Sequence, residues 1–273
     1  MAINLTTKYA KPVVDKFYVE SILANKGNTK FSWDGARSVV VRTITTVTPN
    51  EYTRTGLNRF GTPEEVQDTA QTLEIKQEYG NELTVDAGNN TQQDKIKGGL
   101  AVIAAQLREQ MVPLADKHGI GVLEAGAGKM SADGTLTKSN IVEKIMGAST
   151  HFINAGVPET DNYLLLPASK YTMLRLSPEF VGLEALGNKS VAKGVVGEVA
   201  GFQVVKVPDN YFAGTTNFIV MNKQAFCMPW QLKTAKVLED VQGLDGHLCQ
   251  IRWLFDAFVL DAKKDGVYLS KTA

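Results

Sequence analysis

Residues 39–85 read VVVRTITTVTPNEYTRTGLNRFGTPEEVQDTAQTLEIKQEYGNELTV, which is two extended segments separated by a polar connection. The first segment, residues 39–47, is almost wholly β-branched, and stiff branched side chains favour a strand. In the second, residues 66–85, apolar and polar positions alternate, and we expect an interruption at residues 79–81. The connection has few apolar groups on which to fold, so the sequence predicts a projecting hairpin.

A projecting two-stranded hairpin is expected to be stable only when another part of the protein or another chain packs against it. Such a hairpin is marginally stable in water, and its exposed edges invite pairing with other chains. The sequence therefore indicates an obligate assembly in which a neighbour covers the hairpin. A second interpretation, that the hairpin folds back on its own domain, stays open at this point.

A long helix is expected after the hairpin. At Thr91 the apolar period changes to about 3.6 residues, and residues 91–94, TQQD, resemble a capping box. We expect the helix over residues 91–117, with Pro113 kinking or restarting it near its end. Gly98 and Gly99 would allow a close backbone approach. One apolar stripe recurs at every third or fourth position: Ile96, Leu100, Ile103, Leu107, Met111 and Leu114.

Strands and helices interleave over the rest of the sequence, so the predicted fold class is α+β. A glycine-rich connector over residues 119–135 precedes a helix over residues 139–154, which Gly156 ends. A short helix is expected at residues 169–176. Strands are expected at residues 163–166, 201–207, 217–221, 234–238, 247–262 and 266–269.

Composition excludes several classes of protein. The 273 residues carry 29 basic and 29 acidic side chains, so the electrostatic footprint of a nucleic-acid binder is missing. No apolar run approaches the roughly 18 to 20 residues that span a bilayer. The first residues lack the apolar core of a secretory signal, so we expect a cytoplasmic protein. Cys227 and Cys249 follow no CxxC spacing and are expected to be small core residues.

One glycine-rich motif is a candidate phosphate-binding loop. Residues 126–129 read GAGK, but a P-loop requires glycine where Leu123 stands and serine or threonine where Met130 stands. A solvated connector is the favoured interpretation. We therefore expect no nucleotide at this position.

The side chains that commonly perform chemistry form no recognisable motif. The histidines lie in no frame that places two imidazoles on one helical face. The first acidic pair lies in a polar loop and is expected to be a solvated surface, and the second pair lacks the ligand count and spacing of a calcium loop. These residues are His118, His151, His247, Glu64, Glu65, Asp240 and Asp245. We expect no catalytic residue, no cofactor and no metal site.

The order of elements resembles the major capsid proteins of tailed bacteriophages, which have the Hong Kong 97 fold. That family has an N-terminal arm, a projecting hairpin called the E-loop, a long spine helix, an A-domain, and strands returning beside the helix. Three segments in order resemble the A-domain. They are LTKSNIVEKIMGASTHFINAGVPETD, NYLLLPASKYTMLRLS and GEVAGFQVVKVPDN, at residues 136–161, 162–177 and 197–210.

The resemblance implies a division of the chain into named parts. The N-terminal arm would be residues 1–32, the E-loop residues 33–85 and the A-domain residues 124–233. The P-domain would comprise the spine helix at residues 86–123 and the return strands at residues 234–273.

The resemblance also implies a function and partners. Copies of the chain would assemble into hexamers and pentamers of an icosahedral head that encloses double-stranded DNA without sequence-specific binding. A portal would be a further partner. No long scaffolding segment precedes the arm, and the sequence starts at Met1, which favours a separate scaffolding protein over a cleaved precursor. The protein would assemble in the bacterial cytoplasm and end in the virion.

The E-loop tip would make the contacts with an adjacent subunit, through arginines that pair with carboxylates and aromatic rings that cover apolar surface. The candidate residues are Tyr52, Arg54, Leu57, Asn58, Arg59 and Phe60. Loops at residues 187–197 or 209–216 would gather at the capsomer centre. Some relatives cross-link an E-loop lysine, but Lys76, the only lysine between Trp33 and Val85, lies on a strand. We do not expect that cross-link.

Two alternatives remain. An encapsulin-type compartment subunit has a similar fold and length but encloses a cargo enzyme. An α/β enzyme acting on a small molecule would require a convergent polar pocket, which the sequence does not reveal.

Overall fold

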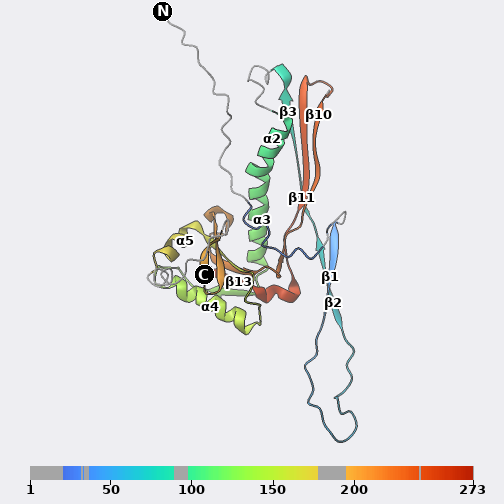
Figure 1. Ribbon diagram of the computed structural model, residues 1–273, viewed down its shortest axis with the longest axis vertical. Coiled ribbons are helices and arrows are strands. Elements are labelled where there is room, and N and C mark those ends of the chain that lie inside the picture. The colour runs from blue at the N-terminus through green and yellow to red at the C-terminus, as the bar shows by residue number, and fades with distance from the viewer. Residues whose placement is uncertain are drawn as a thin grey trace, which may run out of the picture.

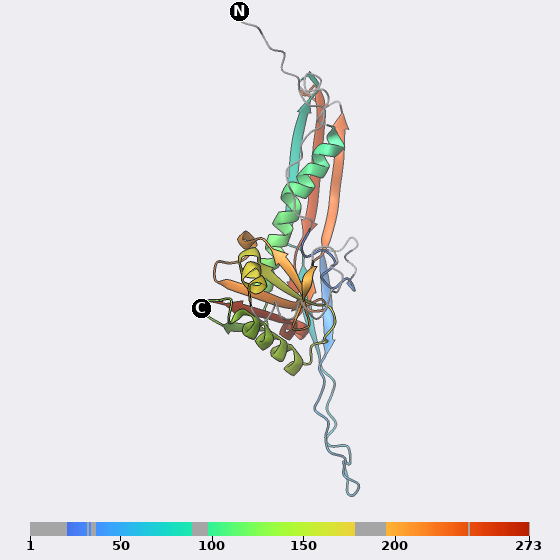
Figure 2. The same cartoon turned by 60° about the vertical axis from the view of Figure 1, so that its left-hand side comes forward.

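A computed structural model describes residues 21–31, 33, 37–88, 98–177, 195–239 and 241–272 of the chain. The molecule has three parts: a projecting ribbon, a long helix beside a three-stranded sheet, and a compact α/β unit (Figures 1 and 2). The predicted N-terminal arm up to residue 20, the predicted start of the long helix at Thr91, and most of the loop at residues 187–197 fall outside the described residues.

The projecting ribbon, residues 38–74, is the predicted hairpin. Strand β1 (Ser38–Ile44) pairs antiparallel with β2 (Asp68–Glu74). The connection between them runs away from the rest of the molecule in both views (Figures 1 and 2). Every residue from 44 to 60 is exposed. The hairpin therefore projects, and the interpretation that it folds back on its own domain is wrong.

The predicted interruption at residues 79–81 is also wrong. These residues lie inside strand β3 (Gln77–Asp86), where Gly80 pairs with Arg252 of strand β11. The interruption lies instead at Ile75 and Lys76, where the chain leaves the ribbon and enters the three-stranded sheet. Ile75 is fully buried there, and the Lys76 N–H donates to the Asp256 carboxylate instead of to a strand.

The long helix is continuous over its described length (Figure 1). It comprises α2 (Gly99–Gln106), the π-helical turn η1 (Leu107–Met111) and α3 (Val112–Ala125). Pro113 lies in the first turn of α3, directly after the π-helical turn, and the helix runs on to Ala125, so the predicted restart near its end is not observed. The helix packs on a sheet in the order β10-β11-β3, formed with β10 (Trp230–Glu239) and β11 (Gly246–Phe255).

One predicted glycine contact is confirmed and its neighbour is not. A Cβ atom built on Gly99 would lie 2.7 Å from Val237 Cγ2 on β10, so only glycine allows this approach of helix and sheet. Gly98 has nothing within 4 Å of the same position. The close approach is therefore a property of Gly99 alone.

The predicted apolar stripe is correct for part of the helix only. Ile103 and Met111 are buried against the sheet, but Leu100 and Leu114 are 78% and 40% exposed. The π-helical turn explains Leu114, because a wide turn adds a residue and rotates the following positions by about 100°. The buried face therefore continues at Ala115 instead.

The glycine-rich segment at residues 119–135 is not simply a connector. Its first part is helical, because α3 continues to Ala125. A Cβ on Gly119 would lie 2.6 Å from Leu23 Cδ1, so this glycine lets the N-terminal segment approach the helix. Residues further along form the short strand β4 (Lys129–Ala132).

The compact α/β unit is built on a six-stranded sheet in the order β4-β13-β8-β5-β7-β6. Its remaining strands are β5 (Asn162–Pro167), β6 (Val195–Val199), β7 (Phe202–Val207), β8 (Thr216–Asn222) and β13 (Val267–Lys271). Every predicted strand in this region falls on one of them. The other elements are η2 (Asp209–Tyr211), η3 (Asp261–Gly266), and the small pair β9 (Phe226–Cys227) and β12 (Phe258–Val259).

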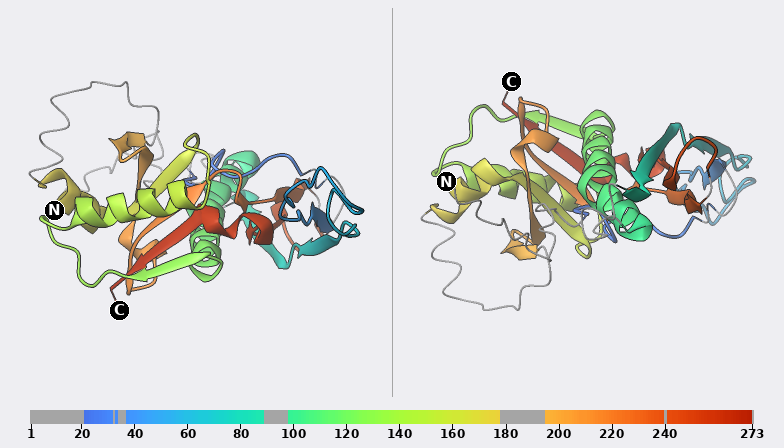
Figure 3. Two further views of the ribbon diagram at one scale, coloured as in Figure 1. Left: turned by 90° about the horizontal axis from the view of Figure 1, so that it is seen from below. Right: turned by 90° about the horizontal axis from the view of Figure 1, so that it is seen from above.

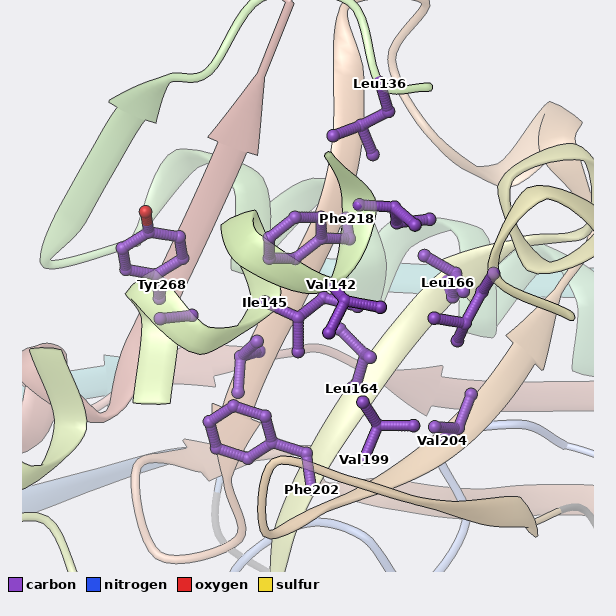
Figure 4. Packing of buried hydrophobic residues seen from close by; sticks show 14 of the residues in the cluster. Leu136, Val142, Ile145, Leu164, Leu166, Val199, Phe202, Val204, Phe218 and Tyr268 are labelled. Atoms are coloured by element: carbon purple, nitrogen blue, oxygen red, sulfur yellow. The ribbon is translucent and has the colours of Figure 1, made fainter. Parts of the chain in front are cut away.

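Each face of this sheet has its own core. Helices α4 (Ile141–Asn154) and α5 (Ala168–Arg175) cover one face, where Leu164 points toward Ile145 and Phe218 (Figures 3 and 4). The end of α3 and residues 22–23 cover the opposite face, which holds Leu165. Alternate residues of β5 thus serve the two cores, as a doubly covered sheet requires.

The C-terminal segment, residues 234–273, divides between the two sheets. β10 and β11 return beside the long helix, whereas β13 lies between β4 and β8 in the six-stranded sheet. Cys227 and Cys249 are both buried and free, so their predicted role as core residues is confirmed.

Candidate functional site

The ribbon tip brings together all six predicted contact residues. The rings of Tyr52 and Phe60 meet edge to face, with centroids 4.9 Å apart. Such a pair contributes about 0.5–1.5 kcal/mol beyond its buried area. The two arms of the connection are therefore held together at the tip.

Backbone hydrogen bonds give the tip a defined shape. The Thr53 N–H donates to the Arg59 carbonyl at 3.2 Å, and the Gly61 N–H donates to the Asn58 carbonyl at 2.9 Å. Gly56 and Asn58 have positive φ angles of 91° and 57°, which glycine and asparagine tolerate best. The tip is thus a formed turn that can present side chains in a fixed order.

The apolar side chains of the tip point into solvent. Leu57 is 96% exposed and Phe60 is 84% exposed. Arg54 and Arg59 flank them, and Arg59 Nε donates to the Gly56 carbonyl at 3.2 Å. An exposed apolar group rimmed by guanidinium groups is typical of a protein–protein contact surface.

A second set of exposed apolar residues lies on the stem of the ribbon and was missed from the sequence. Val39 and Val41 face the body, whereas the alternate positions of β1 face outward. The exposed residues are Val40, Ile44, Val47 and Val66, at 51–69% exposure. For Val40 and Ile44 the available signal was the continuous β-branched run of residues 39–47, because a strand made of such residues presents some of them to each face.

The base of the ribbon is fixed to the body at several points. Leu73 and Ile75 are buried with Trp33 and Leu254. The Gln71 amide bridges β2 to the end of β12, because its Nε2 donates to the Val259 carbonyl at 3.1 Å and its Oε1 accepts from the Asp261 N–H at 3.0 Å. The base of the ribbon is therefore fixed to the body, whereas the tip is exposed.

Asp256 makes a further set of polar contacts at the base. Its carboxylate accepts hydrogen bonds from the Lys76 and Ala257 N–H groups and lies 2.8 Å from His118 Nε2. Burial raises the pKa of Asp256, but hydrogen bonds from His118, Lys76 and Ala257 together bring the pKa below its usual value. The ionised carboxylate is therefore the form that holds this junction.

A different aspartate fixes the N-terminal segment. Asp116 on α3 is 1% exposed and accepts hydrogen bonds from Ser21 Oγ at 2.8 Å and the Ile22 N–H at 2.7 Å. Burial raises the pKa of Asp116, and its hydrogen bonds and the nearby Lys26 ammonium only partly oppose that shift. The segment enters the core beside this carboxylate, with Leu23 against Gly119.

The glycine-rich motif at residues 126–129 packs against another part of the chain. The Gly128 N–H donates to the carbonyls of Lys264 and Val267 at 3.1 Å each. A Cβ at Gly128 would lie 2.4 Å from the Lys264 oxygen. This N–H is therefore used within the fold and does not point to a phosphate.

The three histidines lie in different parts of the molecule. His118 contacts Asp256, His151 lies 5.7 Å from the Tyr268 ring in the core, and His247 is on β11. Among the described residues, no three histidine, cysteine or acidic side chains gather closely enough to hold a metal ion. The described helices include none that is both long and apolar enough to span a membrane.

Solved structures match the chain over almost its whole length. A chain of Mycobacterium phage Che8 has a TM-score of 0.76 at 18% identity, with 99% of each chain covered. The capsid structure of cyanophage P-SCSP1u gives a TM-score of 0.77 at 14% identity, covering 99% of this chain and 93% of that one. This chain has a phage capsid fold.

Further matches extend the same result. The asymmetric unit of the mature capsid of bacteriophage PhiM1 aligns with a TM-score of 0.72 at 14% identity, covering 98% of this chain and 92% of that one. No family model matches the sequence, and no curated protein is significantly similar to it. The capsid fold is thus evident from the path of the chain at sequence identities below 20%. The predicted resemblance to phage capsid proteins is confirmed for the fold.

Proposed function

We propose that the chain is the major capsid protein of a tailed bacteriophage and has a structural rather than an enzymatic role. Its copies assemble into hexamers and pentamers of an icosahedral head that encloses double-stranded DNA, first in the bacterial cytoplasm and then as the virion. The observation that carries this proposal is the ribbon tip, where Leu57 and Phe60 are 96% and 84% exposed on a formed turn. The matching capsid structures support it.

In this proposal the parts of the molecule have the roles that the resemblance implies. Residues 33–85 act as the E-loop, whose tip lies over an adjacent copy, and the long helix and its sheet act as the P-domain. The compact unit acts as the A-domain, and its loop at residues 209–216 is one of the two candidates for the capsomer centre. A separate scaffolding protein and a portal complete the set of partners.

Shortening the connection tests the proposal. A variant lacking residues 51–61 removes the tip but leaves the pairing of β1 with β2 intact. The full-length chain, expressed with its scaffolding partner, is expected to form regular closed particles in electron micrographs. The shortened variant is expected to form few or none, because the contact with the adjacent subunit is lost.

Two controls make the result interpretable. A variant with residues 51–61 replaced by glycine and serine at the same length separates the effect of the side chains from that of the span. Circular dichroism must show both variants folded. Stable monomers of the full-length chain in every condition would contradict the proposal, and particles that contain a protein cargo and no DNA would favour the encapsulin-type alternative.

A further inference from the structure

Asp256 lies where three parts of the molecule meet. It follows β11 and precedes β12, and the residue is 6% exposed. Its Oδ2 accepts from the Lys76 N–H at 2.8 Å, and its Oδ1 accepts from the Ala257 N–H at 2.8 Å and contacts His118 Nε2 at 2.8 Å. One carboxylate thus joins the ribbon base, the turn after β11 and the long helix.

The contact with Lys76 holds the chain at the point where it passes from the ribbon to the three-stranded sheet. Lys76 belongs to the two-residue interruption between β2 and β3, so its N–H faces a carboxylate where a strand partner would otherwise be. The Lys76 N–H is partly buried in this contact, and a carboxylate is a stronger acceptor than a neutral carbonyl. Asp256 therefore stabilises the change of direction between the three-stranded sheet and the ribbon.

His118 fixes the carboxylate from the side of the helix. It belongs to α3, and its ring lies edge-on to Phe255 at a centroid distance of 5.6 Å and an angle of 89°. The aromatic contact orients the imidazole, and the imidazole in turn orients the Asp256 carboxylate. Through these contacts, the direction of the ribbon is fixed relative to the long helix.

A small rotation of the ribbon at its base produces a large displacement of its tip. From Asp68 outward, the connection is exposed as far as the turn that holds Leu57. About 12 residues at about 3.3 Å each give an arm of up to about 40 Å, so a swing of about 10° moves the tip by up to about 7 Å. That displacement exceeds the distance of about 4–4.5 Å between heavy atoms at which two apolar side chains are still in contact.

We propose that Asp256, held by His118, is a positioning residue that sets the direction of the projecting ribbon relative to helix α3. The ribbon base is then a fixed joint, and the tip arrives at one place on a second copy of the chain. The value of this joint for assembly rests on the proposed function, but the position of the ribbon can be measured without assembly.

Distances between two spin labels on the dilute, unassembled full chain test the proposal. One label is placed at Gln67→Cys, beside the end of the ladder, where the Gln67 carbonyl still accepts from the Thr45 N–H, and the other at the exposed Glu143→Cys on α4. Cys227 and Cys249 are buried, and burial raises the pKa of the Cys227 thiol to about 11, so native thiols react slowly.

Three substitutions separate positioning from folding. Asp256→Ala is expected to shift the mean distance by several ångströms or to broaden its distribution at least twofold. His118→Gln, which keeps a donor near the carboxylate, is expected to preserve the wild-type distribution, whereas His118→Ala is expected to broaden it. Asp265→Ala, at an exposed aspartate of η3, is the matched control and is expected to change nothing.

The outcomes are distinguishable. Distributions of Asp256→Ala and His118→Ala that superimpose on wild type, whatever their melting temperatures, would overturn the proposal. If Asp256→Ala does not fold, unchanged distances in Asp256→Asn and His118→Ala together would overturn it equally. Displaced ribbons with undiminished particle formation would keep the positioning role but contradict the proposed function of the tip.

Discussion

Two buried aspartates, Asp116 on α3 and Asp256 in contact with α3 through His118, respond differently to burial. Asp116 has a raised pKa, because desolvation outweighs its hydrogen bonds, whereas Asp256 has a lowered pKa, because its three hydrogen-bond donors outweigh desolvation. Both carboxylates hold backbone N–H groups that are distant in sequence, at Ile22 and Lys76. The same residue type therefore has opposite effects on the pH dependence of stability.

We predict opposite pH profiles for two asparagine variants. The raised pKa of Asp116 contributes stability that is present below the unfolded pKa of about 3.9 and lost as pH rises through the folded value. The lowered pKa of Asp256 contributes stability that is present above about pH 3.9 and lost as pH falls through the folded value.

Urea unfolding of the wild type, Asp116→Asn and Asp256→Asn between about pH 3 and pH 8 measures this difference. The deficit of Asp256→Asn relative to wild type should shrink below about pH 4. The deficit of Asp116→Asn should shrink as pH rises from about 4 through the raised pKa. Parallel curves for all three proteins would contradict both assignments.

Neither aspartate could be singled out from the sequence. Asp116 stands among helix-forming residues and Asp256 inside an apolar run, and their partners lie 94 and 180 positions away. The projection of the connection could be predicted, because it has few apolar groups on which to fold, whereas the choice of the six tip residues followed from the resemblance to the capsid family. Local composition thus indicated the exposed connection but not the contacts that position it.

At the scale of elements, the long helix shows where periodicity succeeds and where it fails. The apolar period correctly gave the helix and the buried positions Ile103 and Met111. It failed at Leu114, because the period assumes 3.6 residues per turn and the π-helical turn before α3 is wider. The sequence pattern also misplaced the interruption of the second extended run. Gly80 was expected to break the strand but is accommodated in β3, whereas the apolar, buried Ile75, which looks like a strand residue, lies outside the strands.

Two glycines of α3 give a matched pair of substitutions. Gly119→Ala places a Cβ 2.6 Å from Leu23 Cδ1, and Leu23 is only 2% exposed, so it has little room to move. We expect Gly119→Ala to lower the free energy of unfolding by about 1–3 kcal/mol. Gly121 has nothing within 4 Å, so Gly121→Ala should raise it by up to about 1 kcal/mol through helix propensity.

Thermal or urea unfolding of the two variants and the wild type measures the change in the free energy of unfolding that each substitution causes. The two changes are chemically identical and lie two residues apart in one helix, so the difference between them reports the contact with Leu23. Equal effects of Gly119→Ala and Gly121→Ala would show that the N-terminal segment does not pack against the helix in solution.

At the scale of the whole molecule, stability and assembly should be separable. Leu57 is 96% exposed, so Leu57→Asp should leave the melting temperature of the isolated subunit unchanged. If a neighbouring copy buries this side chain, the substitution removes about 1.5–3 kcal/mol from each contact. We therefore expect the subunit concentration needed for assembly, measured by light scattering, to rise at least about tenfold.

Thr55→Asp is the control for that measurement, because it adds the same charge to an exposed polar position of the same turn. A fall in assembly for both variants would point to the charge and not to the lost apolar contact. Wild-type assembly of Leu57→Asp would remove Leu57 from the contact surface.

The order of elements along the chain was predictable, but the sheet to which each strand belongs was only partly so. The apolar run at residues 267–269 reads equally well as a strand of either sheet, and only the structure places β13 between β4 and β8. Hydrophobic patterns report which face of a strand is buried, whereas strand order depends on contacts between distant segments.

That strand order has a consequence for the kinetics of folding. Strand β3 has its partner in β11, where Gln77 pairs with Phe255, and β13 completes the six-stranded sheet. Both sheets thus depend on contacts between segments far apart in the chain, which are slow to form because loop closure precedes them. The strands of the ribbon are local and are synthesised early, but the residues that fix their base, Leu254, Asp256 and Val259, are synthesised much later. A nascent chain would then carry an adhesive apolar tip before it has a body, which makes it a natural client for chaperones during synthesis.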